Sequence, residues 1–432
     1  MKKLDRYSRY IMPCLLCVVI VLGIVYSLVQ PLGLSPDEAA HMKYVRFLAS
    51  HGHLPVWKLD GGGEAGYESQ HPPLYYALGA VVYRVTAGLP ENWQWQAVRW
   101  YTLLIGIILM CVSWSFFREY FRGRLPDTIF AFAALGTTPL LLEYMTYINP
   151  DIMSVLWCSI ILWMCMRIAR GEATRKDRII LSLALGFGLL TKLTVLGTLP
   201  LIIVAHLIEP HPESKLPWER RRLLFMGTML GAAAMAAFWY IRNSILYRTP
   251  FIHTEGRFGS GLDIVQAVGM GPHFLWVTLS NTYLTIWVER AWLPPQLLGR
   301  VFYLLISILI IVALLGSVYR AICGSKRLAN IDRAPLLCGI LLLSLIISHQ
   351  AQVWLVDYEF NAGGRYLLNG ILAIQAMIVG SFSQMRFNKI WNILWIVVLI
   401  AINIVSIQYM ISTLNPSNIP EWELMKLTVP YK

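Results

Sequence analysis

The chain has 432 residues, of which 57% are hydrophobic and 14% charged, with 36 Lys and Arg against 24 Asp and Glu and a net charge of +12. Because an ordinary soluble domain is roughly a quarter charged, this composition excludes a soluble globular protein. The basic residues recur in short clusters between apolar runs, which is typical of membrane topology determinants rather than of a nucleic-acid-binding surface.

The apolar runs predict an all-α protein. Spanning segments must satisfy their own backbone hydrogen bonds in the bilayer core, so apolar runs of about 20 residues indicate helices. Together with the distribution of Lys and Arg, they predict a polytopic bundle of about eleven transmembrane helices in one membrane domain, residues 1–432. The longer polar loops contain no cysteine, so neither a disulfide framework nor a zinc site is indicated.

The first predicted helix, residues 11–32, follows a basic start. A signal peptide begins in the same way, but this run is long and no small-residue cleavage site follows it. We therefore expect a retained helix whose N-terminus is cytoplasmic. The basic residues of the start are Lys2, Lys3, Arg6 and Arg9.

Two apolar runs come next, at residues 75–85 and 100–117. The first helix leads outward, and the arginine cluster at 118–124 should be cytoplasmic, so the chain must cross the membrane an odd number of times between them. Only one of the two runs can therefore span, which is a parity argument. Residues 74–85 are therefore expected to lie in the outer interface. On this interpretation residues 33–97 form a first extracytoplasmic loop with interfacial helices.

The same parity argument orients the rest of the chain. Lys192 falls at the outer tip of a short hairpin, and residues 242–299 form a second long extracytoplasmic loop. The apolar part of that loop, 274–287, cannot span without breaking parity, and the C-terminus is extracytoplasmic. The other predicted spans are 128–147, 152–166, 179–190, 195–208, 223–241, 301–322, 336–355, 367–382 and 390–411.

An acidic pair follows the first helix in the segment Ser35-Pro36-Asp37-Glu38. One interpretation is structural, because Ser35 as N-cap and Glu38 three residues later have the pattern of a capping box. The other is functional, because ionisable groups beside a membrane cavity are candidates for function and His41 lies one helical turn from Asp37. The same loop carries His71, but the histidine spacing matches no strong zinc signature, and a divalent metal stays open.

Further candidates fall on the predicted outer side. Asp151 follows Asn149-Pro150 and could simply begin a helix. Lys192 is costly between two apolar segments unless it meets an anion or reaches water. Outer arginines, which the positive-inside rule would not place there, suit a phosphate. They are Arg242, Arg257 and Arg365.

In order along the chain, these motifs resemble the GT-C superfamily of membrane glycosyltransferases, which includes protein O-mannosyltransferases and lipid A aminoarabinose transferases. Each motif is short, and it is their order and common outer placement that carry the resemblance. In one departure, Asn369 stands where a proline is usual, and in another the large soluble extracytoplasmic domains of the relatives are absent. The motifs are Ser35-Pro36-Asp37-Glu38, His71-Pro72-Pro73-Leu74, Arg99, Asn149-Pro150-Asp151, Thr191-Lys192, Trp239-Tyr240-Ile241-Arg242-Asn243 and Gly364-Arg365-Tyr366-Leu367.

The resemblance implies an inverting transfer of a sugar from a polyprenyl-phosphate carrier to an extracytoplasmic glycan, lipid or protein, at a plasma membrane of bacterial type. It implies that Asp37 is the general base, that Glu38 orients a substrate and that Asp151 supports the site. Cations would stabilise the leaving phosphate, and the remaining candidates would bind substrate. The cations are Lys192, Arg242 and Arg365, and the other binding candidates are His41, His71 and Tyr366.

Other functions stay open at this stage. A transporter or lipid flippase would also have many helices, but it predicts internal repeats and charges near the bilayer midplane, and the sequence has no visible repeat. A glycan polymerase or ligase would also use lipid-linked sugars and outer arginines, and an assembly protein would need no site at all. The acidic pair at the exit of the first helix favours the glycosyltransferase.

Overall fold

The structure is a computed structural model that describes residues 2–33, 35–58, 63–207, 217–251, 271–287, 295–323, 332–355 and 363–413. These residues form α-helices and short 3₁₀ helices (η) and contain no strand, so the expected all-α class is confirmed. The elements are α1 (Lys2–Val29), α2 (Glu38–His51), η1 (Tyr67–Gln70), α3 (Leu74–Val85), α4 (Glu91–Tyr120), α5 (Leu125–Gly136), α6 (Pro139–Tyr144), α7 (Asp151–Arg170), α8 (Arg175–Leu189), η2 (Leu193–Thr198), α9 (Leu199–Leu207), α10 (Trp218–Tyr247), α12 (Gly271–Thr285), α13 (Pro295–Cys323), α14 (Ala334–Leu355), η4 (Gly364–Gly370), α15 (Ile371–Phe382) and α16 (Asn388–Thr413).

Eight of the described helical segments are long and apolar enough to cross a membrane. They are α1, α4, α7, α10, α13, α14, η4 with α15, and α16. The other three predicted spans are also helical, but shorter: α5, α8, and η2 with α9. At about 1.5 Å per residue, the 15 residues of α8 fall short of a hydrocarbon core of about 30 Å. The count of eleven therefore stays a prediction, whereas a multi-pass bundle is what the structure has.

The first helix differs from its prediction at both ends. It begins at Lys2 rather than at residue 11, because the basic start continues the helix, and it ends at Val29 rather than at residue 32. Lys and Arg are good helix formers, so an apolar run need not mark where a helix begins. The apolar part available to the membrane is Tyr10–Val29.

The span predicted at 128–147 is in fact broken in two, α5 and α6. Thr138 adopts an extended conformation before Pro139, as the residue preceding a proline tends to do. Polar side chains satisfy the break: Asn403 donates to the carbonyl of Thr137, and Gln375 donates to the Thr138 hydroxyl. Irregular backbone is tolerated in a membrane protein when the surrounding protein supplies such partners.

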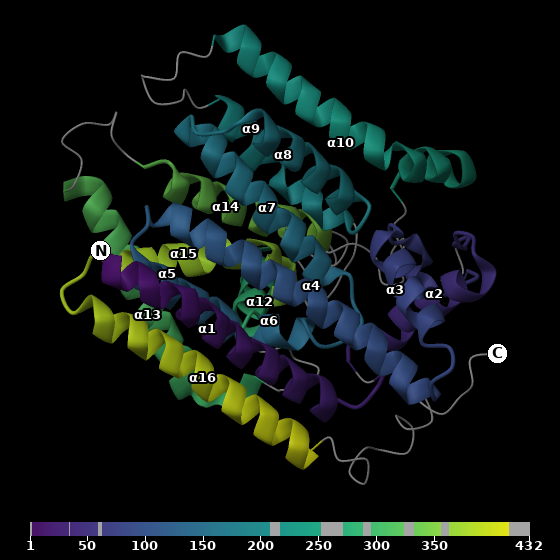
Figure 1. The fold of residues 1–432 in the computed structure, drawn as a ribbon, viewed down its shortest axis with the longest axis horizontal. Helices are drawn as coiled ribbons and strands as arrows, with labels where there is room; N and C mark the ends of the chain where they lie inside the picture. Colours follow the sequence, from purple (N-terminus) through teal and green to yellow (C-terminus); the bar gives the residue numbers. More distant parts are fainter. Residues whose placement is uncertain are drawn as a thin grey trace.

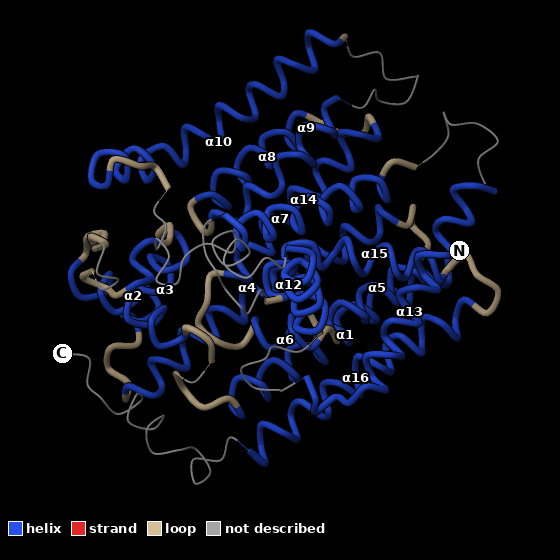
Figure 2. Tube along the Cα trace, turned by 180° about the vertical axis from the view of Figure 1, so that it is seen from behind, coloured by secondary structure: helices blue, strands red, loops and turns tan. Residues whose placement is uncertain are grey.

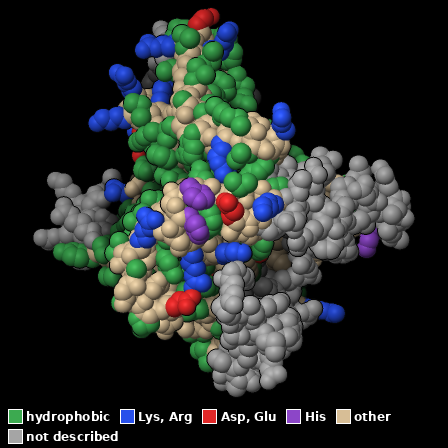
Figure 3. All heavy atoms as spheres, turned by 90° about the vertical axis from the view of Figure 1, so that its right-hand side faces the viewer, with side chains coloured by type: hydrophobic (Ala, Val, Ile, Leu, Met, Phe, Trp, Pro, Cys, Tyr) green, Lys and Arg blue, Asp and Glu red, His purple; other side chains and the backbone are tan. Residues whose placement is uncertain are grey.

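The long helices lie side by side, and α2 and α3 pack against each other at one end of the bundle (Figures 1 and 2). We call this the α2–α3 end. Histidine, acidic and basic side chains share the face that it presents, as expected for a surface in water (Figure 3). Helix α10 lies at the edge of the bundle, where it packs mainly on α8.

The opposite end carries the arginine cluster at 118–124, which is predicted to be cytoplasmic, together with arginines of the last turn of α7. Arg122 and Glu172 form an ion pair of 2.8 Å between the turns after α4 and α7. Arg170 reaches Asp332 at the start of α14, at 2.6 Å. These pairs show that the turn after α4, the turn after α7 and the start of α14 meet at one end of the bundle.

Candidate active site

A cavity of about 460 Å³ lies where the short 3₁₀ helices η1, η2 and η4 come together, on the side of the α2–α3 end. Six parts of the chain supply its ionisable side chains: the start of α2, η1 and the residue after it, the start of α7, the turn before η2, α14 and η4. Pockets of this size suit small organic ligands. Its acidic side chains are Asp37, Glu68 and Asp151, and its basic ones are His41, His71, Lys192, His349 and Arg365.

Asp37 precedes α2 in a left-handed conformation (φ 59°) that few residues other than glycine adopt. The capping-box interpretation is wrong, because α2 begins at Glu38 and its N-cap is Asp37, whose side chain makes no capping bond. The carboxylate instead accepts a hydrogen bond of 2.5 Å from Tyr67 and one of 3.3 Å from Arg365. The turn thus directs Asp37 into the cavity.

The charge of Asp37 is stabilised by its neighbours. Burial raises the pKa of this carboxyl, but Arg365, His41 and the Tyr67 hydroxyl outweigh it, so the pKa of Asp37 lies below its ordinary value. The same contact has the reverse effect on the phenol, because burial and the adjacent carboxylate raise the pKa of Tyr67. Asp37 is therefore ionised and able to accept a proton at neutral pH.

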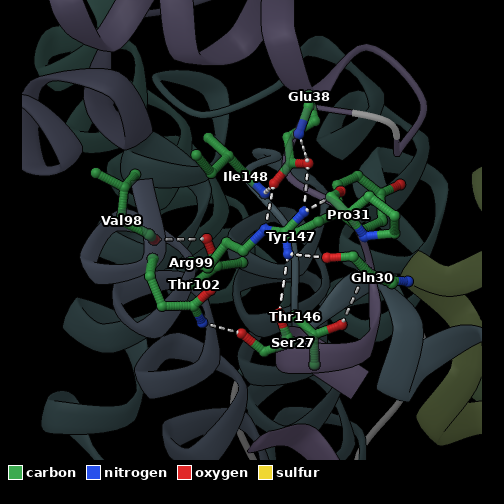
Figure 4. A network of polar contacts seen from close by, with 12 residues as sticks. Ser27, Gln30, Pro31, Glu38, Val98, Arg99, Thr102, Thr146, Tyr147 and Ile148 are labelled. Atoms are coloured by element: carbon green, nitrogen blue, oxygen red, sulfur yellow. Dashed lines mark hydrogen bonds and ion pairs between the residues drawn. The ribbon is translucent and has the colours of Figure 1, made fainter. Parts of the chain in front are cut away.

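Glu38, unlike Asp37, does not line the cavity, and its side chain pairs with Arg99 (Figure 4). Both side chains are fully buried, and two hydrogen bonds of 2.7 Å join them. Glu38 also accepts from the backbone amides of Gly33 and Ile148. The expectation that Glu38 orients a substrate must be corrected, since it lies behind the cavity wall and instead ties the segment before α2 to α4 and to the end of the α6–α7 loop.

Two histidines flank a buried carboxylate on the η1 side of the cavity. The Glu68 carboxylate lies 2.8 Å from His71 Nε2 and 3.5 Å from His41 Nδ1. Burial lowers the pKa of His41, against the opposing effects of Glu68 and Asp37, so this imidazole is neutral near pH 7. His41 Nδ1 lies 2.9 Å from the Tyr76 hydroxyl, which fixes its ring.

Asp151 and Lys192 form the third charged pair, with 2.6 Å between carboxylate and ammonium. The helix start is positioned by Asn149, whose side chain accepts from the Asp151 amide. Lys192 has an extended backbone between α8 and η2, which places its side chain at the cavity. Of the two ways in which the sequence allows Lys192 to be accommodated, an anion or water, the structure provides the anion.

The predicted outer arginines separate in the structure. Arg365 lines the cavity, and its guanidinium lies 5.3 Å from the ring centre of Tyr366, which also lines it. Arg242 does not line the cavity, because it donates to the carbonyls of Pro55 and Leu54, at 2.7 and 3.4 Å, and so ties α10 to the segment after α2. Arg257 lies outside the described residues.

Gly364 and Asn369 explain how η4 is held. The Gly364 amide donates to the Thr285 hydroxyl, and a Cβ at this position would lie 2.1 Å from the backbone nitrogen of Ile286. Asn369, the departure from the usual proline, accepts from Ser154 and donates to Thr194. Its side chain therefore joins η4 to α7 and η2, which proline could not do.

The sequence did not assign Tyr67 and Glu68 of the first loop to the site, and it did not single out His349 at all. Tyr67 and Glu68 follow Gly66 in a 3₁₀ helix of four residues, which is too short to show a hydrophobic periodicity in the sequence. His349 lies in an apolar span, where a lone histidine is hard to distinguish from a core residue. Among the described residues, no group of three or more His, Cys, Asp or Glu is arranged to hold a metal ion.

Comparison with known proteins places this geometry in a wider context. Residues 70–241 match the family of dolichyl-phosphate-mannose-protein mannosyltransferases, a match that includes Asp151 and Lys192 but neither Asp37 nor Arg365. No curated protein sequence matches the chain.

Among solved structures, the oligosaccharyltransferase of Archaeoglobus fulgidus, tethered to an acceptor peptide with the NVT sequon, has 12% sequence identity and a TM-score of 0.51, over 94% of this chain and 56% of that one. ArnT from Cupriavidus metallidurans bound to undecaprenyl phosphate has 17% identity and a TM-score of 0.45, over 96% of this chain and 90% of that one. The chain thus spans little more than half of the oligosaccharyltransferase. With the family match, the likeness in fold to the oligosaccharyltransferase confirms the resemblance to the GT-C superfamily.

Proposed function

We propose that this GT-C-type membrane protein transfers a sugar from a polyprenyl-phosphate carrier to an acceptor hydroxyl at the extracytoplasmic face of a plasma membrane, by a single inverting displacement. One observation carries the proposal: an ionised carboxylate, Asp37, shares a cavity with Arg365 and Lys192. This combination provides a proton acceptor for a nucleophile and cations for a phosphate leaving group. The matched family supports the choice of donor, because its members are described as dolichyl-phosphate-mannose-dependent.

The displacement assigns a role to each of these groups. Asp37 accepts the proton of the acceptor hydroxyl as its oxygen forms a bond with the anomeric carbon of the sugar. The bond from that carbon to the phosphate oxygen breaks, its electron pair stays on the phosphate, and the carrier leaves as a lipid phosphate. Arg365 and Lys192 stabilise the negative charge that grows on the phosphate oxygens. Attack opposite the leaving group inverts the anomeric configuration.

The ion pairs of the cavity hold these groups in place before substrate arrives. Arg365 contacts Asp37 at 3.3 Å, and Lys192 contacts Asp151 at 2.6 Å. Asp151 supports the site by orienting Lys192, and His41 and His71 orient the Glu68 carboxylate. Preorganised charges of this kind need no rearrangement during the reaction.

The test is transfer of a labelled polyprenyl-phosphate sugar by the purified protein in proteoliposomes. Asp37→Asn should lower the rate by at least about a hundredfold, because loss of general-base catalysis typically costs 10² to 10⁴. Asp332→Asn is a matched control, since Asp332 also pairs with an arginine and has a nearly equal exposed side-chain fraction, 36% against 35%, but lies at the opposite end of the bundle. Equal activity of the two folded variants would remove Asp37 from the base role.

A further inference from the structure

His349 is a buried imidazole on the α14 wall of the cavity that has no assigned role. The residue is 4% exposed, and neither ring nitrogen has a hydrogen-bond partner in the described part of the chain. It lines the same cavity as Arg365 and Lys192. Burying polar atoms without partners is costly, so a ligand that supplies them would be favoured at this position.

The ring is held in a fixed orientation. His349 stacks on Tyr366, with 4.5 Å between ring centres and 21° between the planes. Tyr366 is also contacted by both cations of the cavity, because the Arg365 guanidinium lies 5.3 Å and the Lys192 ammonium 5.8 Å from its ring centre. One aromatic ring thus gathers an imidazole, a guanidinium and an ammonium.

We propose that His349 binds the phosphate group of the lipid carrier, an inference that rests on the proposed function. An imidazole N–H donates well to a phosphate oxygen, and the two neighbouring cations attract the same group. Arg365 and Lys192 are already paired with carboxylates, whereas the His349 imidazole keeps its hydrogen-bonding capacity for the ligand.

The face of α14 around His349 fits the chemistry of a lipid phosphate. Leu345 lies one helical turn before His349 and also lines the cavity, beside Leu193 and Leu196 of η2. Gln352 lies on the other side of His349, about one turn further along the same helix. The wall thus passes from apolar through imidazole to amide, in the order in which a polyprenyl-phosphate sugar presents its chain, its phosphate and its sugar.

Binding of farnesyl phosphate to the purified protein tests this inference without requiring sugar transfer. His349→Phe keeps a ring to stack on Tyr366 but removes both nitrogens, and it should weaken binding about tenfold to a hundredfold, the value of a hydrogen bond to a charged group. His349→Gln keeps a hydrogen-bond donor, so its affinity for farnesyl phosphate should lie between that of His349→Phe and that of the parent. Binding of farnesol, which lacks the phosphate, should not change.

The matched control is His206→Phe, because His206 is a similarly buried histidine (5% exposed) on α9 that does not line this cavity. It should bind farnesyl phosphate as the parent does. Inorganic phosphate serves as a second probe: competition only at much higher concentration shows that the site takes a lipid-borne phosphate, and competition at equal concentration overturns the lipid assignment.

The possible failures can be told apart. Unchanged farnesyl phosphate binding by His349→Phe, with weakened binding by Arg365→Gln, overturns the role of His349 and leaves the proposed function standing. If His349→Phe weakens binding of the polyprenyl-phosphate sugar but not of farnesyl phosphate, the phosphate-binding role of His349 is also overturned, because the imidazole would then contact the sugar. If the parent itself binds farnesyl phosphate no better than farnesol, the proposed function fails together with the inference.

Discussion

The environment of Glu38 predicts that this residue acts on stability and not on the chemical step. All five N–H groups of the Arg99 guanidinium have acceptors: two on Glu38 and three on the carbonyls of Ser27, Gln30 and Pro31. Glu38→Gln keeps the shape of the side chain but leaves the guanidinium charge uncompensated. Breaking a buried ion pair in this way costs about 3–5 kcal/mol.

Thermal unfolding in detergent, followed by tryptophan fluorescence, measures this cost. At about 2.1 cal/mol/K per residue, unfolding of a chain of this length has an entropy of about 0.9 kcal/mol/K, so the midpoint should fall by about 3–5 °C. The double variant Glu38→Gln with Arg99→Met removes both charges and should recover part of the loss. A Glu38→Gln protein that unfolds at the parental midpoint yet has lost transfer would refute the reasoning and return Glu38 to the site.

Two further variants test the cavity and the way it is held. Arg365→Gln removes the cation that lowers the pKa of Asp37, so Asp37 should take up a proton at a higher pH and the acid limb of the transfer profile should move upward; an unmoved limb in a protein that still transfers would contradict the pairing. Gly364→Ala places a Cβ 2.1 Å from the Ile286 nitrogen and should lower both thermal stability and transfer, whereas Gly227→Ala, with nothing within 4 Å of the new Cβ, should lower neither. Equal behaviour of the two glycine variants would contradict the close packing of η4 on α12.

The helices could be predicted from the sequence where an apolar run coincides with a helix. Residues 74–85 were expected as one helix and form α3, because Pro72 and Pro73 mark its beginning and a turn follows Val85. A hydropathy profile does not show where a helix is interrupted within an apolar run. Pro139 is the local signal for the first break, which also depends on Gln375 from a distant helix. The 3₁₀ turn at Leu193–Thr198 depends on Ser344 of α14, which donates to the carbonyl of Gly197, and no local pattern shows it.

The candidate site was predictable to the level of its motifs but not of its individual side chains. Neighbouring carboxylates at 37 and 38 look alike in sequence, yet a left-handed turn at Asp37 sends one into the cavity and the other to Arg99. Arg242 and Arg365 have the same charge and the same expected side, and only the packing of α10 separates them. Charge patterns thus indicate which end of the bundle is polar, whereas backbone geometry decides which group faces a substrate.

The pairing of charges explains how an apolar bundle holds so many ionisable groups around one cavity. Each carboxylate has a basic partner: Asp37 has Arg365, Asp151 has Lys192, and Glu68 has His71. An isolated charge would be very costly at such a site, and a basic partner offsets a large part of that cost. It follows that truncating any cation also leaves a carboxylate unpaired, so the loss of activity on truncation overstates its part in the chemistry. The loss of transfer rate in Arg365→Gln therefore measures the part of this cation in the chemistry only beside Asp37→Asn and the double variant, in which the shared cost of the broken pair cancels and the separate contributions of base and cation remain.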